Sequence, residues 1–124
     1  NPFFGIGAGS FTEIFFFNTN FWKGHSHNLL FELSISYGIP ATIIFLVTTI
    51  NILYLSSKKI FFNKIIIDVN YIDRAFWTAL FFFLISQLAD VQYFDGKISL
   101  ITWILMAGLK NIILDKDYGT PAQK

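Results

Sequence analysis

The chain has 124 residues, of which 54% are hydrophobic, 19% aromatic and only 14% charged, and its mean hydropathy is +0.56. About a quarter of the residues of a soluble domain are charged, so this composition is typical of a membrane protein and excludes an ordinary soluble core. A net charge of +1 gives no basic surface for nucleic acid, and the absence of cysteine excludes disulfides and thiolate metal sites.

The first part of the chain, residues 1–11, is rich in glycine, with Gly5, Gly7 and Gly9 separated by apolar residues. Glycine allows the backbone to turn tightly or to approach a ligand closely. A phosphate-binding loop would be followed by Lys and Ser or Thr within a βαβ unit, which is not the case here. We therefore expect a bent helix end or a loop near the membrane surface.

Aromatic and amide side chains dominate the next stretch, and Phe21, Trp22 and Lys23 form a typical interfacial anchor. A platform for stacking sugars is the alternative function of these rings. Beyond them, residues 26–37 have helical spacing of apolar positions, with Ser26 as a possible N-cap. We expect a short interfacial helix here, which Gly38 ends or bends.

Three apolar stretches follow, and we predict transmembrane helices at about 38–56, 74–90 and 98–114. The predicted fold class is therefore all-α, a polytopic membrane protein. Residues 1–37 form a periplasmic loop with the short helix, residues 38–114 hold the spans, and residues 115–124 form a cytoplasmic tail.

Basic residues are more numerous between the first two spans and in the tail than near His27 and the outer turn. Because cytoplasmic segments carry the excess of Lys and Arg, we predict that residues 1–37 and the turn at 90–97 both face outward. The chain begins at Asn1 without Met, and three spans are few for a complete membrane enzyme. We expect a C-terminal portion of a longer protein whose N-terminal half is missing.

The residue best suited to chemistry is His27, next to Asn28 and close to His25. Imidazole moves protons readily near neutral pH, so His27 at a membrane boundary predicts a general base. A histidine that only snorkels to the interface or caps a helix is the alternative. Glu32 lies one turn after Asn28 and either orients an imidazole or faces the lipid headgroups.

A metal site is not predicted. His25 and His27 have a spacing found in some zinc sites, but two ligands are too few, and nothing in the spacing requires Asp90, Asp95 or Glu32 as a third. We expect substrate to be bound by residues around His27 and in the outer turn, namely His25, Asn28, Glu32, Tyr93 and Lys97. In the outer turn, Lys97 would bind a phosphate as a point charge, with Tyr93 beside it. Their alternative role is that of an interfacial belt.

The order His27-Asn28, nine residues, Gly38, three residues, Thr42 resembles a signature of the O-antigen ligase and O-antigen polymerase superfamily of bacterial envelope glycosyltransferases. That signature is His followed by Asn, Ser or Gln, nine residues, Gly, three residues, then Gly, Thr or Tyr. The pattern P-x-x-G-x-G-x-G-x-F at residues 2–11 also resembles this family, as does the turn at 90–99. The likeness covers roughly residues 1–110.

This resemblance implies a metal-independent enzyme of the bacterial inner membrane, with its active loop in the periplasm and no cofactor. Its donor would be an undecaprenyl-diphosphate-linked glycan. Its acceptor would be lipid A-core in a ligase or the growing glycan in a polymerase, and His27 would be the general base. The family holds the diphosphate with outward arginines of its preceding half. This chain has none on the predicted outer side, so the missing half supplies them, or Lys23 and Lys97 substitute in part.

Two other classes of function remain open on the sequence. A transporter or flippase fragment for lipid-linked sugars would use the histidines as proton-coupling groups, although the predicted spans hold almost no ionisable residue. A non-catalytic membrane subunit would use the histidine loop as a docking surface. The resemblance favours the enzyme.

Overall fold

The computed structural model describes residues 1–62, 71–92, 95–116 and 118. These residues form five α-helices and no strand, which confirms the predicted all-α class. The helices are α1 (Ser10–Thr19), α2 (Leu29–Tyr37), α3 (Ile39–Phe62), α4 (Tyr71–Ser86) and α5 (Gly96–Leu114).

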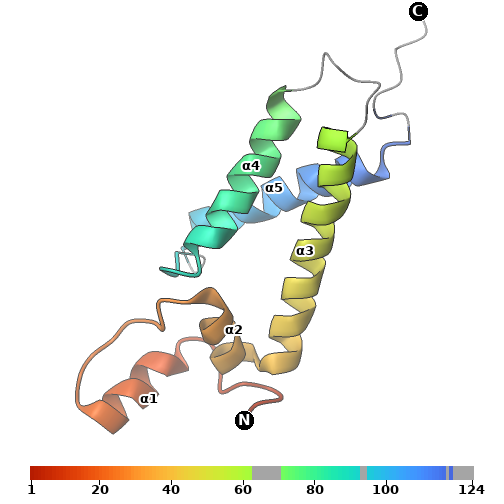
Figure 1. Ribbon diagram of the computed structural model, residues 1–124. Helices are drawn as coiled ribbons and strands as arrows, with labels where there is room; N and C mark the ends of the chain where they lie inside the picture. Colours follow the sequence, from red (N-terminus) through yellow and green to blue (C-terminus); the bar gives the residue numbers. More distant parts are fainter. Residues whose placement is uncertain (63–70, 93–94, 117, 119–124) are drawn as a thin grey trace, which may run out of the picture.

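The two short helices α1 and α2 lie with the N-terminus at one end of the molecule (Figure 1). The long helix α3 runs from this end to the other, and it contacts α2, α4 and α5. Helices α4 and α5 also contact each other, so α3, α4 and α5 form a small bundle, whereas α1 contacts α2. The histidines come just before α2, at the junction of the two parts.

Two helices are long and apolar enough to cross a membrane, not the three that we predicted. Helix α3 has 24 residues with a hydropathy of 1.9, and α5 has 19 residues with a hydropathy of 1.5. Helix α4 has 16 residues, or roughly 24 Å at 1.5 Å per residue, against a hydrocarbon core of about 30 Å. The described residues therefore have a membrane-like helical character with two candidate spans.

The predicted second span fails at its C-terminal end, because the helix stops at Ser86 and not at residue 90. Residues after Ser86 form turns, in which the N–H groups of Ala89 and Asp90 both donate to the carbonyl of Ser86. The carbonyls of Gln87 and Leu88 accept hydrogen bonds from the start of α2. These hydrogen bonds stabilise the non-helical turns after Ser86, so that α4 does not continue.

The first predicted span, in contrast, is longer than expected, because α3 continues past residue 56 to Phe62. Lys58 and Lys59 fit within the helix since both ammonium groups find partners. The Lys58 ammonium lies 4.4 Å from the centre of the Tyr54 ring. Lys59 donates to the carbonyl of Ile112 at the end of α5, where a cation is favoured by the helix dipole.

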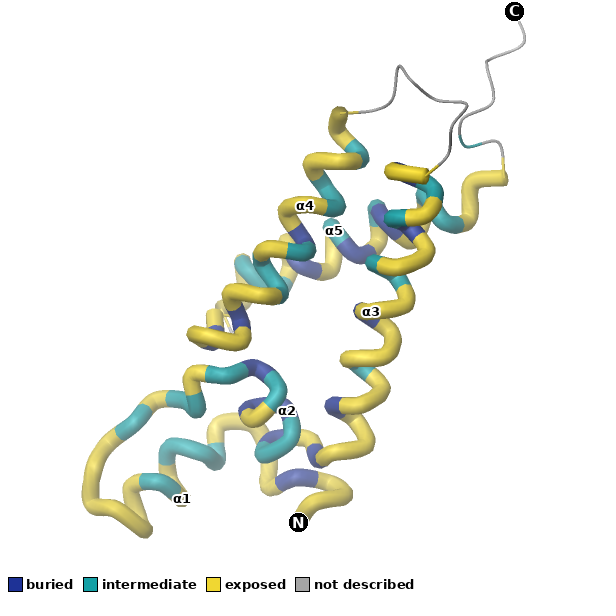
Figure 2. Tube along the Cα trace, viewed as in Figure 1, coloured by how far each residue is buried: buried dark blue, intermediate teal, exposed yellow. Residues whose placement is uncertain are grey.

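Helix α1 was not predicted, and α2 starts later than predicted. No residue of α1 is buried, and most of this helix is exposed (Figure 2), so it has no buried face of the kind from which a helix is predicted. Helix α2 begins at Leu29, and its N-cap is Asn28 and not Ser26. Ser26 instead donates its hydroxyl to the carbonyl of Asn28.

The described residues contain two clusters of buried apolar side chains. The larger, which we call the bundle core, joins α3, α4 and α5 through Ile60, Leu80, Met106 and Leu109. The smaller consists of Leu29, Leu33 and Val91, with Phe45 packed against it. Most other apolar residues of α3 are exposed (Figure 2), and large exposed apolar surfaces mark contact with a membrane or with protein.

Candidate functional site

The nine-residue spacer of the sequence motif is helix α2 itself. Asn28 is its N-cap, and the Asn28 side-chain oxygen accepts hydrogen bonds from the N–H groups of Leu30 and Phe31. Gly38 is the C-cap, and its N–H donates to the carbonyl of Ser34. The motif therefore marks the two ends of one helix, which fixes the distance from the histidines to the start of α3.

Gly38 and Thr42 join α2 to α3. Gly38 has φ of 89° and ψ of 163°, a conformation open to glycine and strained for other residues. Thr42 is buried, donates its hydroxyl to the carbonyl of Gly38, and lies 3.2 Å from the hydroxyl of Ser34. These two residues fix the corner between the helices and do not reach the histidines.

The glycine-rich segment packs its backbone against this corner. The N–H groups of Ile6 and Gly7 donate to the carbonyls of Ile35 and Ser36 at the end of α2, where a helix leaves carbonyls unpaired. A Cβ on Gly5 would overlap the Ser36 backbone. Gly7 and Gly9 also have positive φ, and Gly9 is the N-cap of α1. Gly5 thus allows close backbone packing, whereas Gly7 and Gly9 allow a left-handed backbone.

The His27 side chain pairs with Asp90, which lies 63 positions further along the chain. His27 Nδ1 is 3.1 Å from Asp90 Oδ1, and the same carboxylate oxygen accepts the N–H of Val91 at 3.0 Å. Both side chains are half exposed, at 53% for His27 and 56% for Asp90. The hydrogen bond from His27 lowers the pKa of Asp90 below its usual value of 3.8, and the Val91 N–H acts in the same direction.

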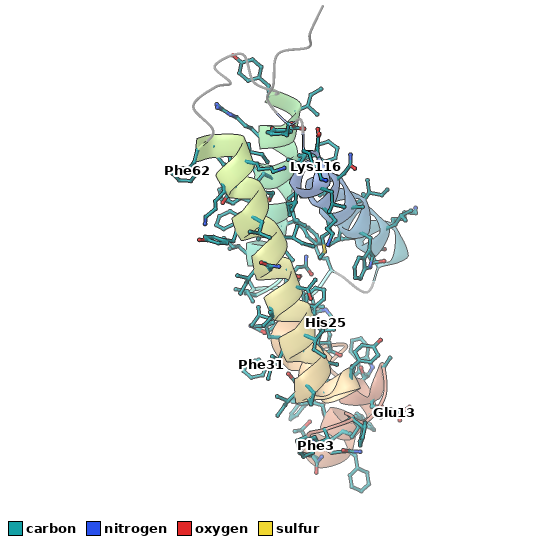
Figure 3. All side chains as sticks on the ribbon, turned by 90° about the vertical axis from the view of Figure 1, so that its right-hand side faces the viewer. Phe3, Glu13, His25, Phe31, Phe62 and Lys116 are labelled. Carbon is teal, nitrogen blue, oxygen red and sulfur yellow. The ribbon has the colours of Figure 1, made fainter. Side chains whose placement is uncertain are left out.

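His25 lies beside this pair. Its Nε2 is 3.8 Å from Asp90 Oδ1, and its ring centre is 4.4 Å from that of His27 in an edge-on arrangement. The backbone N–H of His27 donates to His25 Nδ1 at 3.3 Å. Figure 3 shows His25 between the end that carries Phe3 and the end that carries Phe62. One carboxylate therefore faces two imidazoles.

Asn28 connects the histidine loop to the turn that carries Asp90. Its side-chain nitrogen donates to the carbonyl of Leu88 at 3.0 Å, and the N–H of Leu29 donates to the carbonyl of Gln87 at 2.9 Å. Because Leu88 is two residues before Asp90, these bonds hold the carboxylate near His27. We call this pair of contacts the Asn28 clamp.

His27 has a positive φ of 57°, one of two such values among the described residues other than glycine. The left-handed conformation is uncommon for residues with a side chain. Where such a residue occurs, it often marks a functional site, because the surrounding structure must hold it there. The clamp and the N–H bond to His25 hold His27 in this case.

Glu32 is buried, with 3% of its surface exposed, and so does not face solvent or lipid headgroups. Its carboxylate accepts the backbone N–H of Ser26 at 2.9 Å. It thus holds the backbone between the two histidines and has no direct contact with either ring among the described hydrogen bonds. Its role is to position the loop.

Of the two candidates in the outer turn, the structure describes only Lys97. Lys97 lies in the first turn of α5, exposed, and no ion pair of the described residues includes it. Tyr93 lies outside the described residues, as do Lys64 and most of the predicted tail. Arg74 stacks over the Phe61 ring at the opposite end of α4 from Asp90.

Sequence reasoning missed Asp90 as the partner of His27, although it weighed this residue as a possible metal ligand. A usable signal was present, since the turn at 90–97 was predicted on the same side of the membrane as the histidines. The prediction placed Asp90 at the junction of the second span and this turn, and nothing local in the sequence indicates that its carboxylate reaches His27.

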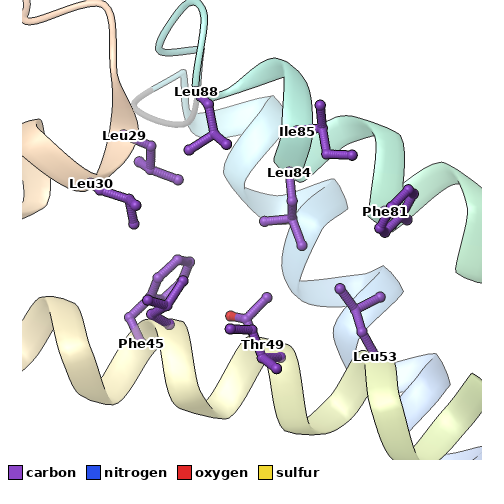
Figure 4. A pocket seen from close by; sticks show the side chains of 11 residues that line it. Leu29, Leu30, Phe45, Thr49, Leu53, Phe81, Leu84, Ile85 and Leu88 are labelled. Atoms are coloured by element: carbon purple, nitrogen blue, oxygen red, sulfur yellow. The ribbon is translucent and has the colours of Figure 1, made fainter.

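An apolar cavity of about 180 Å³ opens next to the site, between α2, α3 and α4. Leu29 and Leu30 line one end, next to the clamp, and Leu88 lines the same end from the Asp90 turn (Figure 4). Thr49 is the one polar residue of its lining, and its buried hydroxyl has no hydrogen-bond partner among the residues that the structure describes. The cavity suits an apolar chain.

No family model matches this sequence, and no curated protein or solved structure shows significant similarity to it. The geometry of the site is therefore the basis for assigning a function.

Proposed function

We propose that this chain is part of a membrane glycosyltransferase of the O-antigen ligase or polymerase type, in the bacterial inner membrane, with His27 as its periplasmic general base. The observation that supports this most is the 3.1 Å contact between His27 Nδ1 and Asp90 Oδ1. A carboxylate on Nδ1 of an imidazole holds the proton there and leaves Nε2 as the basic nitrogen. None of the described hydrogen bonds involves His27 Nε2.

In the proposed reaction, His27 Nε2 takes the proton of an acceptor hydroxyl as its oxygen attacks the anomeric carbon of the donor sugar. A C–O bond to the acceptor forms, and the C–O bond to the diphosphate breaks. The diphosphate leaves on its polyprenyl carrier with the bonding electron pair. Asp90 stabilises the imidazolium that results, and the lowered pKa of Asp90 keeps this carboxylate ionised for that role.

The proposal assigns the cavity beside the clamp to the carrier lipid. A polyprenyl chain is apolar, and ten of the eleven residues that line the cavity are apolar. A chain in this cavity would have its head near Leu29, Leu30 and Leu88, next to His27 and Asp90. As the family resemblance implies, arginines from a further part of the protein would bind the diphosphate.

The test is glycan transfer by the full-length protein in lipid vesicles, with an undecaprenyl-diphosphate-linked donor and either lipid A-core or free glycan as acceptor. A general base contributes roughly 10²–10⁴-fold in rate, so His27→Ala should lose that factor. Asp90→Asn should lose less, since an amide oxygen still accepts from Nδ1. Glu13→Gln is the matched control, because Glu13 is an exposed carboxylate on α1, and it should leave the rate unchanged.

Transfer at the wild-type rate by His27→Ala would overturn the proposal and would favour a docking role for this loop. Loss of donor movement across the membrane in the same variant, with transfer intact for donor supplied outside, would indicate a transporter. Transfer that depends on the acceptor supplied would distinguish a ligase from a polymerase.

A further inference from the structure

We propose that His25, His27 and Asp90 form a reversible binding site for a divalent late transition metal such as Zn²⁺, and that the bound metal blocks proton transfer at His27. The binding half of this inference does not depend on the proposed function. It concerns a ligand that no part of the proposed reaction uses.

The three side chains supply the right atoms in one place. His25 Nε2, His27 Nδ1 and a carboxylate oxygen of Asp90 all lie within 4.8 Å of one another. Two imidazole nitrogens and one carboxylate oxygen form a ligand set used by catalytic zinc sites, which leave a fourth position open. His25 and His27 are neighbours in the sequence, and the fold brings Asp90 to them as the third ligand.

The ligands are held before any metal arrives. The Asn28 clamp ties the histidine loop to the Asp90 turn, and the Val91 N–H orients the carboxylate. The left-handed backbone of His27 places its ring 4.4 Å from that of His25. Bonds around the ligands that fix their orientation raise metal affinity.

Metal binding would also break an existing hydrogen bond, which lowers the metal affinity. A neutral imidazole that binds metal through Nε2 carries its proton on Nδ1. His25 Nδ1 now accepts the His27 N–H at 3.3 Å, so that bond must be lost. The side chains are 35%, 53% and 56% exposed. We therefore expect reversible binding that a chelator removes, and not a permanent structural metal.

The effect on His27 follows from its tautomers. Metal on Nδ1 takes the position that the proton holds in the pair with Asp90. A neutral imidazole with metal on Nδ1 carries its proton on Nε2, which then has no lone pair to accept a proton. The metal would thus inhibit the base without touching the acceptor.

The first experiment is calorimetric titration of the full chain, purified without a polyhistidine tag, with zinc chloride. We expect one zinc per chain. His25→Ala and Asp90→Asn should each weaken binding by more than the roughly 10–100-fold that loss of a bond around a ligand costs. Glu13→Gln should bind like the wild type, and Mg²⁺, which prefers oxygen ligands, should not bind. Cobalt in place of zinc should give the visible absorption of a four-coordinate site.

Two results would overturn the site: no zinc binding by the wild-type chain, or equal affinity in the wild type and both variants. In the transfer assay, zinc should inhibit the wild type, and a chelator should restore the full rate. Inhibition of the Asp90→Asn variant at the same zinc concentration would contradict the mechanism. Zinc binding by a full-length protein that shows no transfer would overturn the proposed function and leave the metal site standing.

Discussion

The bundle core and the histidine end are held together in different ways. Around Leu80 and Leu109, side chains of three helices pack with no exposed surface on either leucine. At the histidine end, the buried cluster has three members, and hydrogen bonds to backbone atoms make most of the connections. Packing tolerates small changes of shape, whereas hydrogen bonds require fixed directions. The histidine end is thus the part that specifies geometry, and the bundle core is the part that supplies stability.

The largest expected effect is that of Leu80→Ala, which opens a cavity in the bundle core. Replacing a buried leucine by alanine costs about 2–5 kcal/mol, so we expect a large fall in the free energy of unfolding, measured by denaturant titration in detergent. Leu33→Ala in the smaller cluster should cost less, because Leu33 is 7% exposed against 0% for Leu80. An equal loss of unfolding free energy in Leu80→Ala and Leu33→Ala would contradict the view that the bundle core supplies most of the stability.

Gly38→Ala should come next and act on the histidine end. Alanine is strained at φ of 89°, and its Cβ would overlap the Phe3 backbone. Strained conformations of this kind cost about 1–3 kcal/mol. We expect faster hydrogen exchange at Ile39, whose N–H donates to Pro2. Gly96→Ala is the control, since nothing lies near a Cβ there, and it should not change that exchange.

Two N-caps allow a matched comparison. Asn28 and Asp95 each accept two backbone N–H groups at the start of a helix, so alanine at either should cost about 0.5–2 kcal/mol of stability. Only Asn28 also binds Leu88. We expect Asn28→Ala, and not Asp95→Ala, to separate His27 from Asp90 and to lower both the proposed glycan transfer and the proposed zinc affinity. Equal losses in the two variants would show that the clamp has no role of its own.

The smallest expected effect is the pH dependence of stability that comes from Tyr118, at the end of the bundle away from the histidines. Burial, and then a hydrogen bond to Asp73, raise the pKa of Tyr118 from 10.0 to about 12. The neutral phenol is the form that the fold favours, so this contribution is complete below pH 10 and is lost as the pH rises through 12. Tyrosine absorbance should show a late step near pH 12. Tyr118→Phe should remove that step, and a step that persists would contradict the assignment.

The long apolar segments and the helical character were predictable because they depend on local composition. The end of α4 was not predictable from local sequence, because the carbonyls of Gln87 and Leu88 accept hydrogen bonds from residues some 60 positions away. The pairing of His27 with Asp90 escaped prediction for the same reason. The role of Asn28 as a cap was hidden by Ser26, an equally good cap residue that lies two positions earlier. Helix α1 was missed because it has no buried side.

The length of α2 has a consequence for how this chain can vary. The helix has nine residues between Asn28 and Gly38, and each added or deleted residue would rotate one end against the other by about 100° and shift it by about 1.5 Å. The corner at Gly38 is bonded to the N-terminal segment, and the clamp at Asn28 is bonded to the turn after α4. The exposed side chains of α2, Phe31 and Tyr37, can change freely, but a single insertion would put the imidazole out of register with its carboxylate.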